Sequence, residues 1–158
     1  MRHATTALVV GIAAALGASG ASAVANRHHG DHSKMKRTFT LVEHPDSDVT
    51  VDTGAAGDSV GDILPFANPL FDAKDAKQVG TDQGWCIRTQ VGVAWECTWT
   101  TFLPGGQIVA QGPFLDSGEP STLAITGGTG KYARASGTLT LKLNAANPAK
   151  FDFTYRLR

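Results

Sequence analysis

The sequence lacks an excess of charge of either sign and, after its first residues, any long apolar run. Lysine plus arginine and aspartate plus glutamate number 14 each in 158 residues. No basic stretch stands out, so we expect neither nucleic acid nor an anionic membrane as a partner. No later segment approaches the roughly 20 apolar residues that a membrane helix needs. We therefore expect no membrane insertion of the mature chain.

The first residues have the pattern of a secretory leader. Arg2 and His3 give a short basic start, and residues 7–17 are apolar but too few to span a bilayer. Small residues follow at 21–25, where a signal peptidase would cut. We assign residues 1–25 to a signal peptide and expect a secreted, extracellular protein.

A histidine-containing segment follows the leader and has no apolar periodicity. Residues 26–36 include His28, His29 and His32 among charged side chains. Imidazoles are common metal ligands, but this short polar segment offers no framework to fix their geometry. We interpret it as a flexible tail and expect no metal. Residues 127–131, GGTGK, lack the first glycine of a phosphate-binding loop, so we expect no nucleotide or other cofactor.

The remaining residues, 37–158, predict one all-β domain. Short alternating runs are separated by turns rich in glycine and proline, which is typical of strands in an antiparallel sheet. Eight such strands, joined in sequence, predict an eight-stranded antiparallel β-barrel, lipocalin-like in shape; a β-sandwich is the alternative. The expected strands span residues 39–43, 61–66, 85–91, 93–102, 106–114, 122–126, 133–143 and 150–157.

The two cysteines predict a cross-strand disulfide. If Val91 and Gly92 form a two-residue hairpin loop, residues whose numbers sum to 183 lie opposite each other, and Cys86 and Cys97 satisfy this condition. Opposed cysteines in an exported protein are well placed to form a bridge. The alternative is a free Cys86 thiol activated by Arg88, two residues along the same strand.

One strand face is strongly aromatic. Trp95, Cys97, Trp99 and Thr101 alternate with polar residues, so they share a face that we assign to the interior. This face is either part of a filled core or the wall of a cavity in which flat aromatic surfaces bind an apolar guest.

Four sequence blocks are similar to those of a known family. They are GDILPFANPLFD at 61–72, QVGTDQGWC at 78–86, GGQIVAQGPFL at 105–115 and LAITGGTGKYARASGTLTL at 123–141. In this order they resemble the allene oxide cyclases and, more loosely, the dirigent proteins of the same barrel superfamily. The resemblance implies a barrel, a homotrimer and an elongated apolar cavity.

The resemblance also implies a function. Allene oxide cyclases fold an unstable fatty-acid epoxide so that it closes to one enantiomer of a cyclopentenone, and dirigent proteins guide phenoxy-radical coupling. We therefore expect an isomerase-type barrel that binds an apolar small molecule and steers its stereoselective cyclisation or isomerisation. The alternatives are a non-catalytic carrier of a hydrophobic ligand and a dirigent-like director of radical coupling.

Carried over by position, the resemblance implies a set of site residues. Asn68 matches the cyclase asparagine that helps to hold a water against the epoxide oxygen; the alternative is an asparagine that caps its own Asn-Pro turn. The family glutamate on the first strand corresponds to Glu43, the only glutamate nearby, although a gapless comparison places Leu41 there. The implied apolar substrate-binding residues, together with Trp99 from the aromatic face, are Leu64, Phe66, Cys86, Trp95, Trp99 and Phe114.

Overall fold

The computed structural model describes residues 38–158. The predicted signal peptide over residues 1–25 and the predicted tail over residues 26–36 lie outside the described residues. Within 38–158, no helix is long and apolar enough to cross a membrane.

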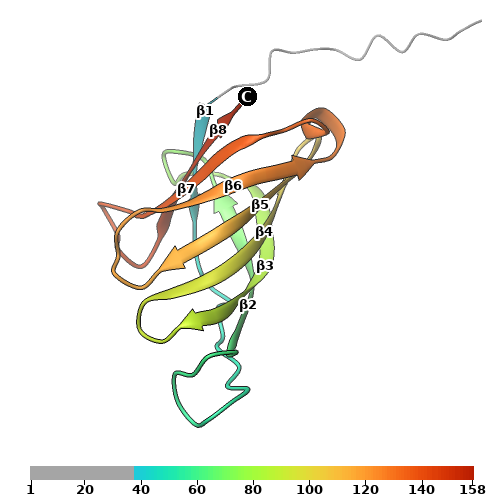
Figure 1. Ribbon diagram of the computed structural model, residues 1–158. Helices are drawn as coiled ribbons and strands as arrows, with labels where there is room; N and C mark the ends of the chain where they lie inside the picture. Colours follow the sequence, from blue (N-terminus) through green and yellow to red (C-terminus); the bar gives the residue numbers. More distant parts are fainter. Residues whose placement is uncertain (1–37) are drawn as a thin grey trace, which may run out of the picture. The chain divides into compact units, whose positions relative to one another are not determined.

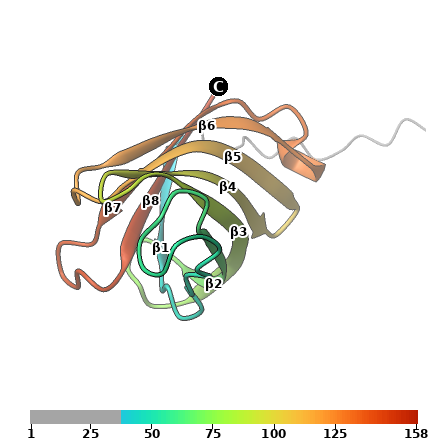
Figure 2. The ribbon, with the colours of Figure 1, turned by 60° about the horizontal axis from the view of Figure 1, so that its bottom comes forward.

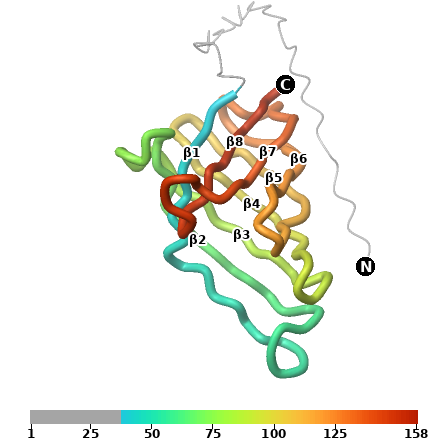
Figure 3. The backbone as a smooth tube through the Cα atoms, turned by 90° about the vertical axis from the view of Figure 1, so that its left-hand side faces the viewer, coloured from blue at the N-terminus to red at the C-terminus, as the bar shows by residue number. Residues whose placement is uncertain are grey.

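The described chain forms a closed barrel of eight antiparallel strands in sequence order (Figure 1). The barrel closes where β1 pairs with β8, from Thr38 opposite Arg156 to Glu43 opposite Phe151, and these two strands lie side by side in Figure 3. The predicted barrel is confirmed and the sandwich alternative is wrong. The strands are β1 Thr38–Glu43, β2 Ile63–Phe71, β3 Gln78–Gln90, β4 Ala94–Leu103, β5 Gly106–Leu115, β6 Ser121–Gly128, β7 Gly137–Leu143 and β8 Phe151–Leu157.

One end of the barrel is formed by the four connections that leave the odd-numbered strands. These are residues 44–62, 91–93, 116–120 and 144–150, and we call this end the mouth. Figure 2 shows the long connection from β1 to β2 in front of the barrel. At the opposite end, the connection between β6 and β7 contains the short helix η1, Gly130–Tyr132, so β7 begins four residues later than the predicted strand at 133.

Strand β2 is longer than the sequence predicts and runs through both of its prolines. Asn68 lies in the middle of the strand, between Pro65 and Pro69, so the Asn-Pro turn alternative is wrong. Proline cannot donate to a neighbouring strand and is tolerated where a strand edge is open. Here β2 pairs with β3 along its whole length but with β1 at only two positions, Val42 and Glu43.

The β3–β4 hairpin has the predicted register with a different turn. Cys86 lies opposite Cys97 and Arg88 opposite Trp95, yet the loop contains the three residues Val91–Val93 rather than two. A bulge between Arg88 and Gln90 compensates for the extra residue. Gly92, with a φ of 66°, takes the left-handed conformation that such a loop needs. The predicted Cys86–Cys97 disulfide is present, so the free-thiol alternative is wrong.

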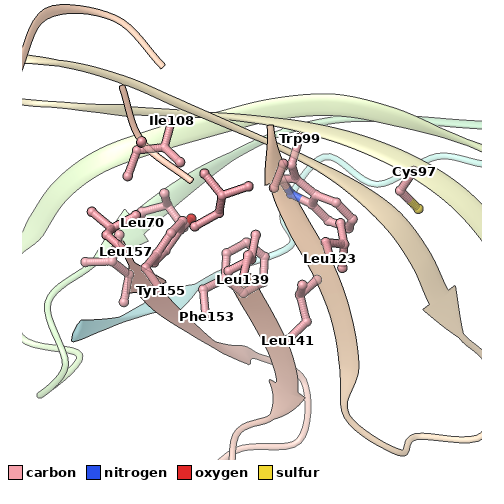
Figure 4. Close-up of a cluster of buried hydrophobic side chains, with 14 of the residues drawn as sticks. Leu70, Cys97, Trp99, Ile108, Leu123, Leu139, Leu141, Phe153, Tyr155 and Leu157 are labelled. Atoms are coloured by element: carbon pink, nitrogen blue, oxygen red, sulfur yellow. The ribbon is translucent and has the colours of Figure 1, made fainter. Parts of the chain in front are cut away.

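Aromatic and aliphatic side chains fill most of the barrel interior (Figure 4). Trp99 of β4 lies at the centre, with ring centroids 4.5 Å from Phe66 of β2 and 5.8 Å from Phe153 of β8. Phe66 and Trp99 meet above Gly84, which lies between them on β3. A Cβ atom on Gly84 would lie 2.6 Å from the Phe66 ring, so the glycine allows the two rings to come together.

Candidate functional site

Three buried polar side chains lie together among the apolar residues of the interior. Glu43 is the last residue of β1, Asn68 lies in β2, and Asp82 lies opposite Asn68 on β3. All three point inward because they occupy the same alternating positions as the core residues of their strands. Their exposed fractions are only 3%, 2% and 2%. Ionisable groups are seldom so deeply buried without a specific role or partner.

The side-chain amide of Asn68 is fully hydrogen-bonded. Its Nδ2 donates to Glu43 Oε1 at 3.0 Å and to Asp48 Oδ1 at 2.8 Å. Its Oδ1 accepts from the backbone N–H of Ser47 at 3.1 Å and from Ser47 Oγ at 2.9 Å. An amide has only two N–H donors, so this Asn68 has none left for a ligand. The residue joins segment 47–48 to β2 and orients Glu43.

Glu43 and Asp82 interact as a coupled pair of carboxyl groups. Burial raises the pKa of Glu43 well above its usual range, and the charge of Asp82 raises it further. Burial also raises the pKa of Asp82, to about 7, although the neighbouring Glu43 carboxyl, the backbone N–H of Asn68 and the indole of Trp99 all lower it. The interaction between the two groups therefore favours a proton on Glu43 and the charge on Asp82. Together they hold a titratable proton near neutral pH.

Trp99 connects the carboxyl pair with the aromatic part of the interior. Its indole N–H lies near enough to Asp82 to lower the pKa of that carboxyl. Nevertheless, Trp99 Nε1 is buried without a hydrogen-bond partner among residues 38–158. Asp82 Oδ2 likewise receives no hydrogen bond from an N–H or alcohol donor in this part of the chain. The site thus contains an unused donor and an unused acceptor.

A cleft opens at the mouth of the barrel. It has a volume of about 370 Å³ and is lined by residues of β5, β6, β7, β8 and the β5–β6 connection, including Phe114, Leu141 and Phe151. The rings of Phe114 and Phe151 meet at 5.8 Å between centroids. Because β5 and β8 are not neighbouring strands, this contact crosses the interior. Phe114 also faces Trp99, and Phe151 lies opposite Glu43 on the adjacent strand.

Arg88 closes the other side of the mouth. Its guanidinium stacks on Trp95, 3.9 Å from the ring centroid, and its Nε lies 2.6 Å from Asp58 in the long β1–β2 connection. It also pairs with Asp116, which lies in the wall of the cleft. A buried cation shared by two carboxylates and an aromatic ring is well compensated. At the mouth, Phe114 and Phe151 therefore lie on the side that the Arg88 guanidinium does not cover.

Most of the predicted site residues face the interior of the barrel, but they lie at different distances from the mouth. Trp95 and Phe114 are direct neighbours near the mouth, whereas Asn68 lies deeper, at the level of Thr101. Cys86 is bonded to Cys97, and Arg88 covers Trp95. Phe66 and Trp99 lie between these levels, and Leu64 is half-buried toward the mouth.

Two carboxylates of the site were missed from the sequence. Asp82 and Cys86 both occupy even-numbered positions of β3. The alternation that places Cys86 inside the barrel therefore also places Asp82 there. Asp48 lies outside any strand, where no periodicity signals its direction. In the described part of the chain, no group of three or more His, Cys, Asp or Glu residues is arranged to hold a metal ion.

Removing the Asn68 amide is expected to destabilise the barrel. An Asn68→Ala protein loses four side-chain hydrogen bonds and leaves the buried Glu43 without its amide donor, which should cost about 2–3 kcal/mol. Chemical denaturation checks this value. Asn144→Ala, which removes an amide bonded to Asp152 outside the interior, serves as the control. Equal stability of wild type and Asn68→Ala would contradict the claim that the hydrogen bonds of the amide stabilise the barrel.

The sequence comparison gives a family match over most of the described chain. The sequence model of the family described as "Allene oxide cyclase" matches residues 42–158. This range begins one residue before Glu43 and contains all the residues of the carboxyl site.

Comparison with solved structures gives related barrels. A pyocyanin demethylase is 37% identical, with a TM-score of 0.66, and the similarity covers 77% of this chain and 99% of the other. A pterocarpan synthase dirigent protein is 18% identical, with a TM-score of 0.59 and coverage of 74% and 82%. A Diels–Alderase from Streptomyces koyangensis is 15% identical, with a TM-score of 0.56 and coverage of 77% and 67%. The last two share the fold alone.

Proposed function

Because the chain belongs to the allene oxide cyclase family, we propose that its barrel binds a flat apolar small molecule and steers its cyclisation or isomerisation by proton transfer. The observation that carries this proposal is the Glu43–Asp82 pair, buried among aromatic rings in the barrel interior. Export through the leader and assembly as a trimer stay predictions from the sequence.

The carboxyl pair supplies both an acid and a base. At neutral pH Glu43 is the partner that carries a proton and Asp82 the partner that becomes charged, because burial raises the pKa of Glu43 well above its usual range and that of Asp82 to about 7. Environments that separate two neighbouring carboxyls in this way are a common basis of acid–base catalysis. In an isomerisation the O–H bond of one carboxyl breaks as a substrate O–H forms, and the pair regains a proton when product forms. No net proton is consumed.

The surrounding rings restrict the substrate and exclude water. Phe66, Trp99 and Phe153 form a rigid aromatic group beside the pair, and Phe114 with Phe151 separates it from the cleft. A reactive molecule held between such surfaces has few conformations available, which lowers the entropic part of the barrier and favours one stereochemical outcome. Entry requires Phe114 or Phe151 to turn aside.

A planar aromatic heterocycle is the second candidate substrate. The observation that favours it is the similarity to a pyocyanin demethylase at 37% identity over nearly the whole of that protein. Flat rings of Phe66, Trp99 and Phe114 offer matching surfaces for such a ligand.

The test compares both substrates with the same variants. The oxidised protein is incubated with a fatty-acid allene oxide generated in place, with chiral analysis of the product, and separately with pyocyanin, followed by absorbance and product analysis. We expect turnover of one substrate, reduced at least 100-fold in Glu43→Gln and in Asp82→Asn. Glu96→Gln, on the exposed outer face of β4, should keep full activity.

Full activity in both carboxyl variants would contradict proton transfer by the pair. Recovery of both compounds chemically unchanged after long incubation would instead support a carrier of a hydrophobic ligand. An effect on product chirality only in the presence of an oxidant would support the dirigent-like alternative.

A further inference from the structure

The unused hydrogen-bonding groups of the interior lie on two adjacent strands. Trp99 Nε1 is a buried donor and Asp82 Oδ2 a buried acceptor, and neither is bonded to an N–H, hydroxyl or carbonyl group in residues 38–158. Burying an N–H without a partner costs about 1–3 kcal/mol, and native proteins rarely tolerate this without a reason. Even if Asp82 Oδ2 shares the Glu43 proton, it has a second lone pair for another donor.

The register of β3 and β4 places these two groups close together on the inner face of adjacent strands. Trp99 lies opposite Gly84, and Asp82 is two residues from Gly84 on the same face of β3. Diagonal neighbours of this kind are within reach of long side chains. Gly84 has no side chain, and the ring of Phe66 packs over it, 2.6 Å from where a Cβ atom would lie. The rings of Phe66 and Phe153 pack against the indole and prevent it from turning its N–H elsewhere.

We infer that Trp99 Nε1 and Asp82 Oδ2 together bind one hydroxyl group of the substrate. This inference rests on the proposed function, because it requires a small molecule in the interior. The hydroxyl oxygen accepts a hydrogen bond from the indole N–H, and its hydrogen is donated to Asp82. A hydroxyl does both, whereas an ether accepts only, an ammonium group donates only, and a methyl group does neither.

The inferred substrate class is therefore a flat apolar molecule with one hydroxyl, such as a phenol or an enol. Asp82 takes the hydroxyl proton, so the substrate O–H bond breaks and a carboxyl O–H bond forms. The negative charge that develops on the substrate oxygen faces the Trp99 N–H, whose hydrogen bond strengthens as the charge grows. Trp99 is thus a binding residue that also stabilises the reacting oxygen.

A pair of isosteric probes tests this inference without knowledge of the natural substrate. The probes are 2-naphthol and 2-methylnaphthalene, which differ by a hydroxyl in place of a methyl group, and their dissociation constants are measured by calorimetry. Two hydrogen bonds should make 2-naphthol bind at least tenfold more tightly to the wild type. Trp99→Phe should reduce this ratio at least fivefold. Trp85→Phe, on the exposed outer face of β3, should leave the ratio unchanged.

A spectroscopic measurement on the wild type avoids any folding defect of the variant. Binding of 2-naphthol should move the indole ¹H–¹⁵N signal of Trp99 in the direction of a stronger hydrogen bond, whereas 2-methylnaphthalene should not. Equal affinity for both probes, with no selective shift, would overturn the hydroxyl site and leave the apolar binding function intact. Failure of both probes to bind would overturn the site and the proposed function together.

Discussion

An Asp82→Asn protein is expected to lose the part of the decline in stability between about pH 4 and pH 7 that Asp82 contributes, whereas the buried Glu43, whose pKa is also raised, keeps the rest. Burial raises the pKa of Asp82 from 3.8 to about 7. The folded protein therefore binds more protons than the unfolded chain in this window, and stability falls as pH rises through it. Above the folded pKa, the wild type carries the full cost of the buried charge.

The expected magnitude follows from the size of the shift. A shift of about three pH units corresponds to roughly 4 kcal/mol, since one unit equals 1.36 kcal/mol. Because the unfolded Asp82 is already partly ionised at pH 4, we expect Asp82 to contribute a fall of about 3 kcal/mol from pH 4 to pH 8. Urea unfolding at a series of pH values measures it. Glu96→Gln should keep the wild-type decline, and a wild type whose stability rises across this window would contradict the buried pair.

Removal of the Cys86–Cys97 bridge is expected to have the second large effect. The disulfide joins residues 11 apart, and closure of a loop of this length stabilises a protein by about 3 kcal/mol in the chain-entropy account. A Cys86→Ala/Cys97→Ala protein should therefore unfold roughly 10 °C below the wild type. The bridge joins β3 and β4 between the Arg88–Trp95 contact and Trp99. Its loss should therefore make this part of the barrel wall more mobile.

Thermal unfolding with and without a reductant checks this second result. Reduction should lower the midpoint of the wild type to nearly that of the double variant, and should leave the double variant itself unchanged. Identical midpoints for oxidised and reduced wild type would show that the bridge does not stabilise the barrel.

The β3–β4 hairpin shows how far sequence reasoning reaches. The alternation of Trp95, Cys97 and Trp99 gave the interior face correctly, because side-chain direction in a strand is fixed by the pleat. The Cys86–Cys97 pairing was also correct, although the turn has one residue more than expected. A bulge absorbed that residue, and a sequence pattern does not reveal where a bulge will form.

Less of the candidate site could be predicted from the sequence. Leu41 and Glu43 are two residues apart on β1 and both point inward, so alternation could not choose between them. In the structure Glu43 accepts a hydrogen bond from Asn68, whereas Leu41 belongs to the apolar core. Three of the four side-chain hydrogen bonds of Asn68 involve Ser47 and Asp48. These two residues lie outside any strand, and tertiary packing alone decides their position.

The most direct test of the account is a pH titration of the side-chain carboxyl carbons of Glu43 and Asp82 by ¹³C NMR. The account predicts that the two signals titrate together, that the pair still holds a proton at pH 6, and that Asp82→Asn changes the titration of Glu43. Both carboxyls fully ionised at pH 5, titrating independently of each other, would contradict the shared proton on which the proposed chemistry depends.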